Sequence, residues 1–317
     1  MNAIYKIMGL LYARFVQVIS VLPQSVRPFL YYTPWKLFST FLHHSSKKTA
    51  KKNSETPTCK MLESRDFFRE NTDRVDKVAS YFIDDASRDC YYKMIDFRCN
   101  SHVSNFPSVS KVQYFDNEYF KYSENEVFVD CGAYNGVTIM YFKHMLKKLK
   151  KHAKKIVAFE PGEKYDILTS AHNDLEVLKA GVWSKNDTLH FCEFGATSVV
   201  FDKNLAPPHE RPDPVTGSEE PSRIVSIPVR SIDSCTECEG VTFLKMDIEG
   251  AEMDALKGAI NTIAKYKPKL AICIYHSDED MIKIPEWVHE NFPEYKMFVR
   301  HHLKFSIFET VLYGFVE

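Results

Sequence analysis

Asp130 ends a short apolar segment, residues 126–130, and a turn of mostly small residues follows at once. Gly132 and Gly136 lie four residues apart in this turn, whose sequence is Asp-Cys-Gly-Ala-Tyr-Asn-Gly. A nucleoside triphosphate loop would end in Gly-Lys and Ser or Thr, but Val137 follows the last glycine. A dinucleotide loop would need a third glycine and no acid facing the pyrophosphate. The acid favours a cationic ligand, and S-adenosylmethionine carries an ammonium and a sulfonium group.

A second acid, Glu160, ends the next apolar segment, residues 156–160. In open α/β sheets the ligand lies beyond the carboxyl ends of the strands, near the point where the strand order reverses. A carboxylate at the tip of the neighbouring strand can accept hydrogen bonds from ribose hydroxyls. The turn after Asp130 alone could be a strand-to-helix connection without a ligand. With Glu160 in place, binding of a methyl donor is the stronger hypothesis.

A third acid, Asp247, ends an apolar segment at 241–247, and Glu249 and Glu252 follow it. Acids in the first turn of a helix complement the helix dipole, so these two glutamates could be purely structural. The three acids could also hold a divalent cation through oxygen ligands. They would have to converge across a turn, and we therefore predict no metal.

His276 ends the following apolar segment, residues 269–276. A lone histidine is more often a structural residue with its hydrogen bonds satisfied than a catalyst. At the carboxyl end of a strand next to Asp247, however, its ordinary pKa of ~6.5 suits deprotonation of a hydroxyl. Methyl transfer from a charged donor needs only an in-line nucleophile, a nearby base and exclusion of water. We expect His276 and Asp247 to be the catalytic residues.

Around these residues, strand-like and helix-like patterns alternate along the chain. Strands are expected at 126–130, 156–160, 175–183, 188–194, 241–247, 269–276, 295–302 and 308–316, with helices near 138–151, 165–175, 251–266 and 281–291. This alternation predicts an α/β fold with a doubly wound, mostly parallel, seven-stranded sheet. The last two strands are joined too briefly for a parallel crossover, so one strand near the C-terminus should be antiparallel.

Three parts are expected along the chain: a basic helical arm and linker at 1–58, a helical lead-in at 59–125 and the α/β domain at 126–317. Four apolar residues of the lead-in fall on one helical face, namely Val75, Val78, Ala79 and Phe82. The loop 206–223 contains five prolines and many charges. A loop of this length is a lid, a recognition element or a segment without fixed structure.

The composition is that of a soluble globular protein, with 44% hydrophobic and 26% charged residues. The first 54 residues carry eight basic and no acidic side chains, so the remainder has 33 basic and 42 acidic ones. The arm has no uninterrupted apolar run of ~20 residues for a membrane span and no clear cleavage site for a signal peptide. It is either a pair of helices packed on the body or a peripheral contact to an anionic membrane. An acidic body also makes nucleic acid an unlikely acceptor.

Eight cysteines are scattered through the sequence, and the only close pair is Cys235 and Cys238. Neither a second pair nor a set of histidines completes a zinc site. We expect ordinary reduced thiols and hence a cytoplasmic protein.

Six segments of the sequence, in order, resemble one family. They are VFVDCGAYNG, AFEPGEKY, KAGVWSKNDTLHF, FLKMDIEGAEMDALKGA, KPKLAICIYH and YKMFVRHHLKFSIFETVLYGF. In them the chain is similar to FkbM-type S-adenosylmethionine-dependent methyltransferases, over roughly residues 75–317. DIEGAE followed by ETVLY is the most specific part, because the glycine turn alone is common to class I methyltransferases. The resemblance implies a Rossmann-like methyltransferase domain at 126–317.

The resemblance also implies roles for particular residues. S-adenosylmethionine would be bound by Asp130, Gly132, Ala133, Asn135, Gly136, Glu160, Pro161, Gly181, Val182 and Asp247. Within this set, Glu160 would hold the ribose, while Gly181 and Val182 would lie near the adenine. The acceptor would contact Ser198, Glu249, His276 and His302. Neither the arm nor the loop 206–223 inherits a role from the family.

The leading hypothesis is O-methylation of a hydroxyl, as the resemblance implies, on a sugar of a glycan or glycoconjugate. One alternative is a nicotinamide-dependent sugar oxidoreductase, which would need the missing third glycine. The other is a non-catalytic scaffold with a methyltransferase fold, for which broken donor-site acids would be expected. Asp130, Glu160 and Asp247 are all present, which disfavours the scaffold.

Overall fold

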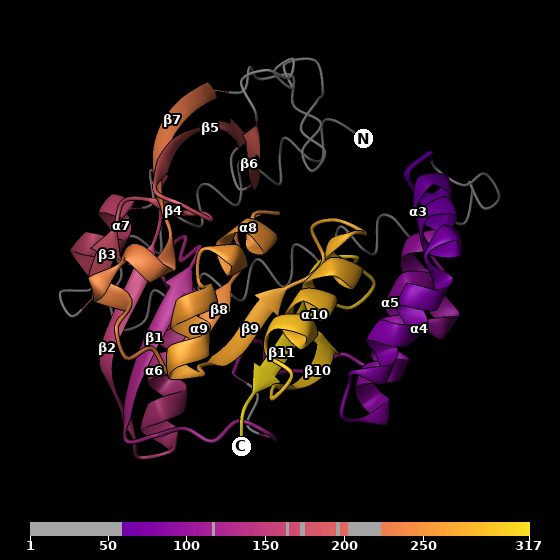
Figure 1. Cartoon of the computed structure of the whole chain (residues 1–317), viewed down its shortest axis with the longest axis horizontal. Helices are drawn as coiled ribbons and strands as arrows, with labels where there is room; N and C mark the ends of the chain where they lie inside the picture. Colours follow the sequence, from indigo (N-terminus) through magenta and orange to yellow (C-terminus); the bar gives the residue numbers. More distant parts are fainter. Residues whose placement is uncertain (1–58, 116–117, 163–164, 172–174, 195–196, 202–222) are drawn as a thin grey trace, which may run out of the picture. The chain divides into compact units, whose positions relative to one another are not determined.

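The computed structural model describes residues 59–317, except 116–117, 163–164, 172–174, 195–196 and 202–222 (Figure 1). Residues Cys59–Glu317 form one compact unit. The predicted arm and almost all of the proline-rich loop lie outside the described residues. Within the described part, no helix is both long and apolar enough to cross a membrane.

The main sheet has seven strands in the order β10-β11-β9-β8-β1-β2-β3. Their bounds are β1 Asn125–Cys131, β2 His152–Phe159, β3 Glu176–Leu178, β8 Phe243–Met246, β9 Lys269–Cys273, β10 Lys296–His301 and β11 Thr310–Phe315. β11 is antiparallel to both of its neighbours, and all other pairs are parallel. The predicted seven-stranded, mostly parallel sheet is confirmed, and its antiparallel strand lies near the C-terminus.

A second sheet of four strands was not predicted. Its order is β4-β7-β5-β6, with bounds β4 Gly181–Val182, β5 Asp187–Phe194, β6 Thr197–Phe201 and β7 Arg223–Arg230. β5 is antiparallel to both β6 and β7, so a single antiparallel strand is an imprecise description of the whole molecule. Figure 1 shows this sheet beyond one end of the main sheet.

The expected strand at 175–183 is in fact two short strands in different sheets. The N–H of Ala180 donates to the carbonyl of Leu178 at 2.9 Å, which turns the chain between β3 and β4. β4 begins three residues after β3 ends, so the second sheet starts at the carboxyl edge of the main sheet.

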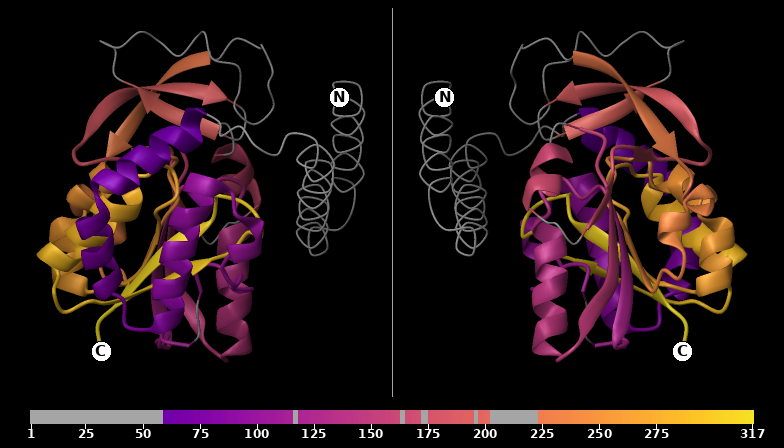
Figure 2. Two further views of the ribbon diagram at one scale, coloured as in Figure 1. Left: turned by 90° about the vertical axis from the view of Figure 1, so that its right-hand side faces the viewer. Right: turned by 90° about the vertical axis from the view of Figure 1, so that its left-hand side faces the viewer.

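Helices cover both faces of the main sheet, as expected for a doubly wound fold (Figure 2). Their bounds are α3 Cys59–Glu70, α4 Thr72–Ser80, α5 Asp85–Asn100, α6 Val137–Lys148, α7 Tyr165–Ala171, α8 Glu252–Lys257, α9 Ile260–Tyr266 and α10 Asp280–Asn291, with 3-10 turns η1 Val103–Asn105, η2 Ile232–Ser234 and η3 Thr236–Cys238. The single helix expected at 251–266 is therefore two helices, α8 and α9.

Alternate side chains of the central strands build two apolar cores. Val129 and Leu244 face the side covered by α5, α8 and α10, whereas Phe128 and Phe243 face the side covered by α6. This alternation is what a parallel sheet buried on both faces requires. The core fixes the strands, and the strand ends then carry the candidate site.

The lead-in helices belong to the same packed body as the sheet. The Asp84 side chain accepts the N–H of Ser87 at 2.6 Å and caps α5. Arg300 of β10 forms an ion pair with Asp84 at 3.0 Å, and Ser87 Oγ accepts the N–H of Val299. Val75, Val78 and Ala79 are buried as their spacing predicts.

Candidate functional site

The glycine turn, residues 130–136, lies where the strand order reverses. From β1 the chain runs outward to β2 and β3 and later returns to β8 on the other side of β1. Gly132 has φ +82°, and a Cβ there would lie 1.9 Å from the backbone carbonyl oxygen of Asp247. The turns after β1 and β8 therefore touch through their backbones, which only glycine permits.

Glu160 shapes the glycine turn from the tip of β2. Its carboxylate accepts the N–H of Tyr134 and the N–H of Gly162, both at 2.8 Å. Burial raises the pKa of Glu160 above its ordinary value, although these two hydrogen bonds oppose the rise. Asn135 accepts the N–H of Val137 at 3.3 Å at the start of α6. The remaining lone pairs of Glu160 can still accept hydroxyls.

Asp130 is buried beneath the turn and not on its surface. Its side chain is 0% exposed, and Oδ1 lies 2.9 Å from Lys245 Nζ. Lys245 also donates to the backbone carbonyls of Gly132 at 2.9 Å and Cys131 at 3.3 Å. Burial alone would lower the pKa of Lys245, but Asp130 and Asp247 outweigh it and raise that pKa. The pair is charged, and Asp130 acts on the turn through Lys245.

Asp247 is held by two phenols. Tyr114 donates to Oδ2 at 2.8 Å and Tyr275 donates to Oδ1 at 2.9 Å. Burial would raise the pKa of Asp247, but Lys245, His276 and both tyrosines outweigh it and lower that pKa. Asp247 is thus a fixed carboxylate at neutral pH.

His276 lies among three acids that, with it, we call the His276 cluster: Asp247, Glu249 and Glu252. Nδ1 lies 3.1 Å from Glu252 Oε1, and Nε2 lies 3.6 Å from Asp247 Oδ1 and from Glu249 Oε2. Burial would lower the pKa of His276, but the acids outweigh it and raise that pKa to about 9. The pKa therefore departs upward from the ordinary value expected from the sequence, and the surrounding acids favour the protonated ring at neutral pH.

Glu249 has the opposite perturbation. Burial raises its pKa to about 7, partly offset by His276. Its φ of +57° is uncommon for a residue other than glycine, and its side chain is 38% exposed. It is the member of the cluster most open to an acceptor.

The other predicted residues lie in the second sheet, in the glycine turn and beside Glu160. Gly181 and Val182 form β4 of the second sheet, and Ser198 is on β6 with its side chain outside the described part. Ala133 is buried, Gly136 precedes α6, and Pro161 is half-buried beside Glu160. The structure thus brings the glycine turn, Glu160, Asp247, Glu249 and His276 to one edge of the sheet.

Both ring nitrogens of His302 contact other protein groups, so His302 supports neighbouring residues and does not face an acceptor. Its Nδ1 lies 3.2 Å from the carbonyl of Ser110 and its Nε2 lies 2.8 Å from the Tyr313 hydroxyl. The Tyr313 hydroxyl accepts the N–H of Tyr114 at 2.8 Å and donates its own proton to Nε2 of His302. Because the carbonyl of Ser110 can only accept, the ring carries its proton on Nδ1. Burial lowers the pKa of His302 to about 3. The neutral ring helps to fix Tyr114 against Asp247.

Three contributors were missed by sequence reasoning. Lys245 could have been noticed as a charge inside an apolar strand, and Tyr275 as the neighbour of His276. Tyr114 gave no signal, because it follows no periodic segment and reaches Asp247 only through the fold.

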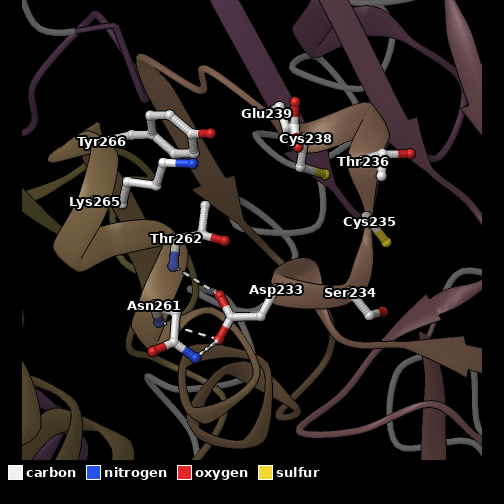
Figure 3. Close-up of a pocket in the computed structure, with 10 residues that line it drawn as sticks. All are labelled: Asp233, Ser234, Cys235, Thr236, Cys238, Glu239, Asn261, Thr262, Lys265 and Tyr266. Carbon is white, nitrogen blue, oxygen red and sulfur yellow. Dashed lines mark hydrogen bonds between the residues drawn. The ribbon is translucent and has the colours of Figure 1, made fainter.

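A separate cavity of about 260 Å³ lies between η2, η3 and α9 (Figure 3). Asp233 lines it and accepts the N–H groups of Asn261 and Thr262, which caps α9. Cys235 and Cys238 also line it and are free thiols, as expected. None of the predicted site residues lines this cavity.

The fold is of the Rossmann-like α/β class, and Glu160, Asp247 and Glu249 lie at the carboxyl edge of its main sheet. The model of the methyltransferase FkbM domain matches residues 130–305, which is more than half of the chain, and the chain belongs to this family. The crystal structure of methyltransferase FkbM from Methylobacillus flagellatus KT is similar, with a TM-score of 0.61 and 24% identity, which shows the shared fold. That likeness covers 78% of this chain and 60% of the other, and no curated protein matches the sequence.

Proposed function

We propose that this protein is an S-adenosylmethionine-dependent O-methyltransferase acting on a hydroxyl of a sugar in a glycan or glycoconjugate. One observation supports the proposal most strongly: the glycine turn lies directly beside the His276 cluster, because the backbone of Gly132 contacts that of Asp247. A donor held by the turn would then face the cluster. FkbM family membership supports methyl transfer.

Two features of the glycine turn support S-adenosylmethionine as the donor, although Asp130 itself is buried against Lys245 and does not face it. The absence of a side chain at Gly132 lets the glycine turn pack directly on the backbone of Asp247, and Glu160 offers a carboxylate at the tip of the neighbouring strand. Gly181 and Val182 begin the second sheet at the same edge and are proposed to border the adenine. When bound, the donor supplies an electrophilic methyl group on a sulfonium.

In the proposed reaction the acceptor hydroxyl lies against Asp247 and His276. Asp247, fixed by Tyr114 and Tyr275, accepts a hydrogen bond from the acceptor and orients it. His276 takes the hydroxyl proton after losing its own. Because its pKa is about 9, this step is favoured at alkaline pH.

An exposed aromatic ring supports a carbohydrate acceptor. Phe308 is 46% exposed, and its ring contacts that of Tyr275 edge-on at 5.9 Å. Tyr275 is one of the two tyrosines that donate hydrogen bonds to Asp247. An aromatic face beside the reacting edge suits the apolar C–H face of a sugar ring.

Calorimetric titration with S-adenosylhomocysteine tests donor binding. The full chain should bind it, and Gly132→Ala should abolish binding because the new Cβ meets backbone at 1.9 Å. Gly240→Ala is the matched control, since Gly240 also has a positive φ, +76°, but open space around it. Binding of NADH in place of S-adenosylhomocysteine would favour the oxidoreductase.

Transfer itself is measured with donor labelled on the methyl group and a cell glycan extract. Label released as a methyl sugar after hydrolysis would support the acceptor class. Donor binding with no transfer to glycans, lipids or proteins would favour the scaffold.

A further inference from the structure

Glu252 is buried in a way that a helix-dipole partner does not need. It is the first residue of α8 and is 0% exposed. Its Oε1 accepts the N–H of Ile248 at 2.8 Å and its Oε2 accepts the N–H of Gly250 at 3.0 Å. The carboxylate therefore turns back on the loop after β8, and the same Oε1 lies 3.1 Å from His276 Nδ1.

The two nitrogens of His276 face different surroundings. Nδ1 faces the fully buried Glu252, whereas Nε2 faces the partly exposed side chains of Asp247 and Glu249 at 3.6 Å. The ring itself is only 9% exposed, and neither nitrogen makes a well-aligned hydrogen bond to a described residue. Catalytic hydrogen bonds are often loose before substrate binds and tighten in the complex.

We propose that Glu252 is the positioning residue of His276: it accepts the Nδ1 proton and leaves Nε2 as the nitrogen that takes the acceptor's proton. This rests on the proposed function. A base oriented by a buried carboxylate is the arrangement that activates hydroxyls in several unrelated enzyme folds. The backbone N–H groups of Ile248 and Gly250 in turn fix the carboxylate.

The proton and electron balance of the step is simple. The acceptor O–H bond breaks and its proton passes to Nε2, while the oxygen lone pair forms the new O–CH₃ bond. The C–S bond breaks and its electrons remain on sulfur. His276 becomes an imidazolium whose charge Glu252 stabilises, and it then returns the Nε2 proton to water.

A divalent cation is the competing explanation of the same side chains. Asp247, Glu252 and His276 each place a ligand-type atom within 4.8 Å of the others. Both oxygens of Glu252 already accept backbone N–H groups, however, which favours the pairing with His276. A cation is therefore an outcome that the test must be able to detect.

The test is ¹⁵N NMR of the histidine rings in the full chain as a function of pH, with His276→Gln assigning the signals. The neutral ring should carry its proton on Nδ1. Glu252→Gln should lower the pKa of His276 by at least one unit and give a mixture of tautomers. Asp254→Asn, on the same helix but with a 35% exposed side chain, should change neither.

Charged or titratable groups on every neighbouring element contribute to this titration. They are Glu252 on α8, Asp247 and Glu249 before it, Asp280 on α10 and Glu309 before β11. Only the loss of Glu252 should change the tautomer, because the others face Nε2 or act at longer range. A proton on Nε2 in the unaltered protein, or an unchanged tautomer in Glu252→Gln, would overturn the proposal.

Three further readings separate this proposal from its alternatives. An affinity for S-adenosylhomocysteine within threefold of that of the unaltered protein would show that the Glu252→Gln variant is folded. If that variant does not fold, Glu252→Asp takes its place: it keeps a carboxylate and should preserve the Nδ1 tautomer in part. Manganese chloride alone, at stoichiometric concentration, should leave the His276 signals sharp; broadening that Asp247→Asn removes would show a cation site instead. Absence of S-adenosylhomocysteine binding in the unaltered protein would refute the proposed function, while the tautomer would still test the pairing.

Turnover distinguishes a positioning role of Glu252 from a purely structural one, because a structural role would not change the pH profile of kcat. With a glycan acceptor, Glu252→Gln should lower kcat on the order of 10²-fold with little change in the KM for the donor. The rising limb of kcat against pH should also move to lower pH. An unchanged profile would mean that Glu252 supports only the loop.

Discussion

At His276, the electrostatics of the cluster matter more than the residue type. Three carboxylates surround one buried imidazole and raise its pKa to about 9. A raised pKa means that the folded state gains stability from the proton on His276. That contribution is complete below the unfolded pKa of ~6.5 and is lost as the pH rises through about 9.

The charge on His276 should make donor affinity depend on pH. S-adenosylmethionine carries a sulfonium that S-adenosylhomocysteine lacks, and a protonated His276 beside it repels the sulfonium. The affinity for S-adenosylmethionine relative to S-adenosylhomocysteine should therefore rise severalfold between pH 7 and 9.5, as His276 loses its proton. Calorimetric titrations with both ligands across this range measure the ratio.

His276→Gln supplies the control for this dependence, because it removes the titrating ring. In that variant the ratio of the two affinities should be flat across the same pH range. A slope that survives the substitution would assign the dependence to another group.

Lys245 connects β8 to β1 and to the glycine turn, so its loss should affect the packing of these elements against one another. It is 1% exposed and pairs with Asp130 across β1 and β8. Lys245→Met would leave Asp130 as a buried, unpaired charge and should cost about 3–5 kcal/mol of the free energy of unfolding. Urea denaturation measures this loss.

A double variant separates the charge from the packing. Asp130→Asn combined with Lys245→Met removes both charges and should be more stable than Lys245→Met alone. A double variant as unstable as the sum of its parts would mean that the two residues act independently.

Gly258 fixes the break between α8 and α9 against the segment that follows β4. A Cβ at this position would lie 2.1 Å from the backbone oxygen of Trp183. Since backbone must move, Gly258→Ala should cost about 3 kcal/mol or more of the free energy of unfolding. Gly240→Ala, with open space around it and φ +76°, should cost only about 1–2 kcal/mol of backbone strain.

Equal losses of stability in the two glycine variants would contradict this account of the helix break. Urea denaturation of both variants in the same buffer makes the comparison.

At the level of the whole molecule, the sequence predicted which edge of the main sheet carries the candidate site, because three of its strands end in acids. Asp130, Glu160 and Asp247 follow apolar segments, and parallel strands bring such ends to one edge. The second sheet was not predicted, because Pro228 weakens the strand pattern of β7 and the 202–222 segment separates β7 from β6.

The details of the site depended on contacts that only the fold creates. Tyr114 reaches Asp247 across 133 positions of sequence, and the pKa of His276, which follows β9, depends on acids in the loop after β8 and at the start of α8. Glu252 could be read from the sequence as a dipole partner, but its burial could not.

The uneven charge of the whole chain leads to a prediction about membranes. The first 54 residues carry eight basic and no acidic side chains, while the rest has nine more acidic than basic ones. An acidic body is on average repelled by an anionic surface, so we expect the arm to supply most of the attraction, at about 1 kcal/mol per basic side chain. Deleting residues 1–54 should therefore reduce co-sedimentation with phosphatidylserine vesicles, and salt should weaken the binding of the full chain.

Position, and not only the number of charges, decides this binding. Changing Lys47, Lys48, Lys51 and Lys52 to alanine should weaken sedimentation, whereas the same change at Lys147, Lys148, Lys150 and Lys154 of the body should have a smaller effect. Both quadruple variants have the same net charge, so a difference between them identifies the arm as the contact. Equal sedimentation of the full and the shortened chain would instead favour an arm packed as helices on the protein.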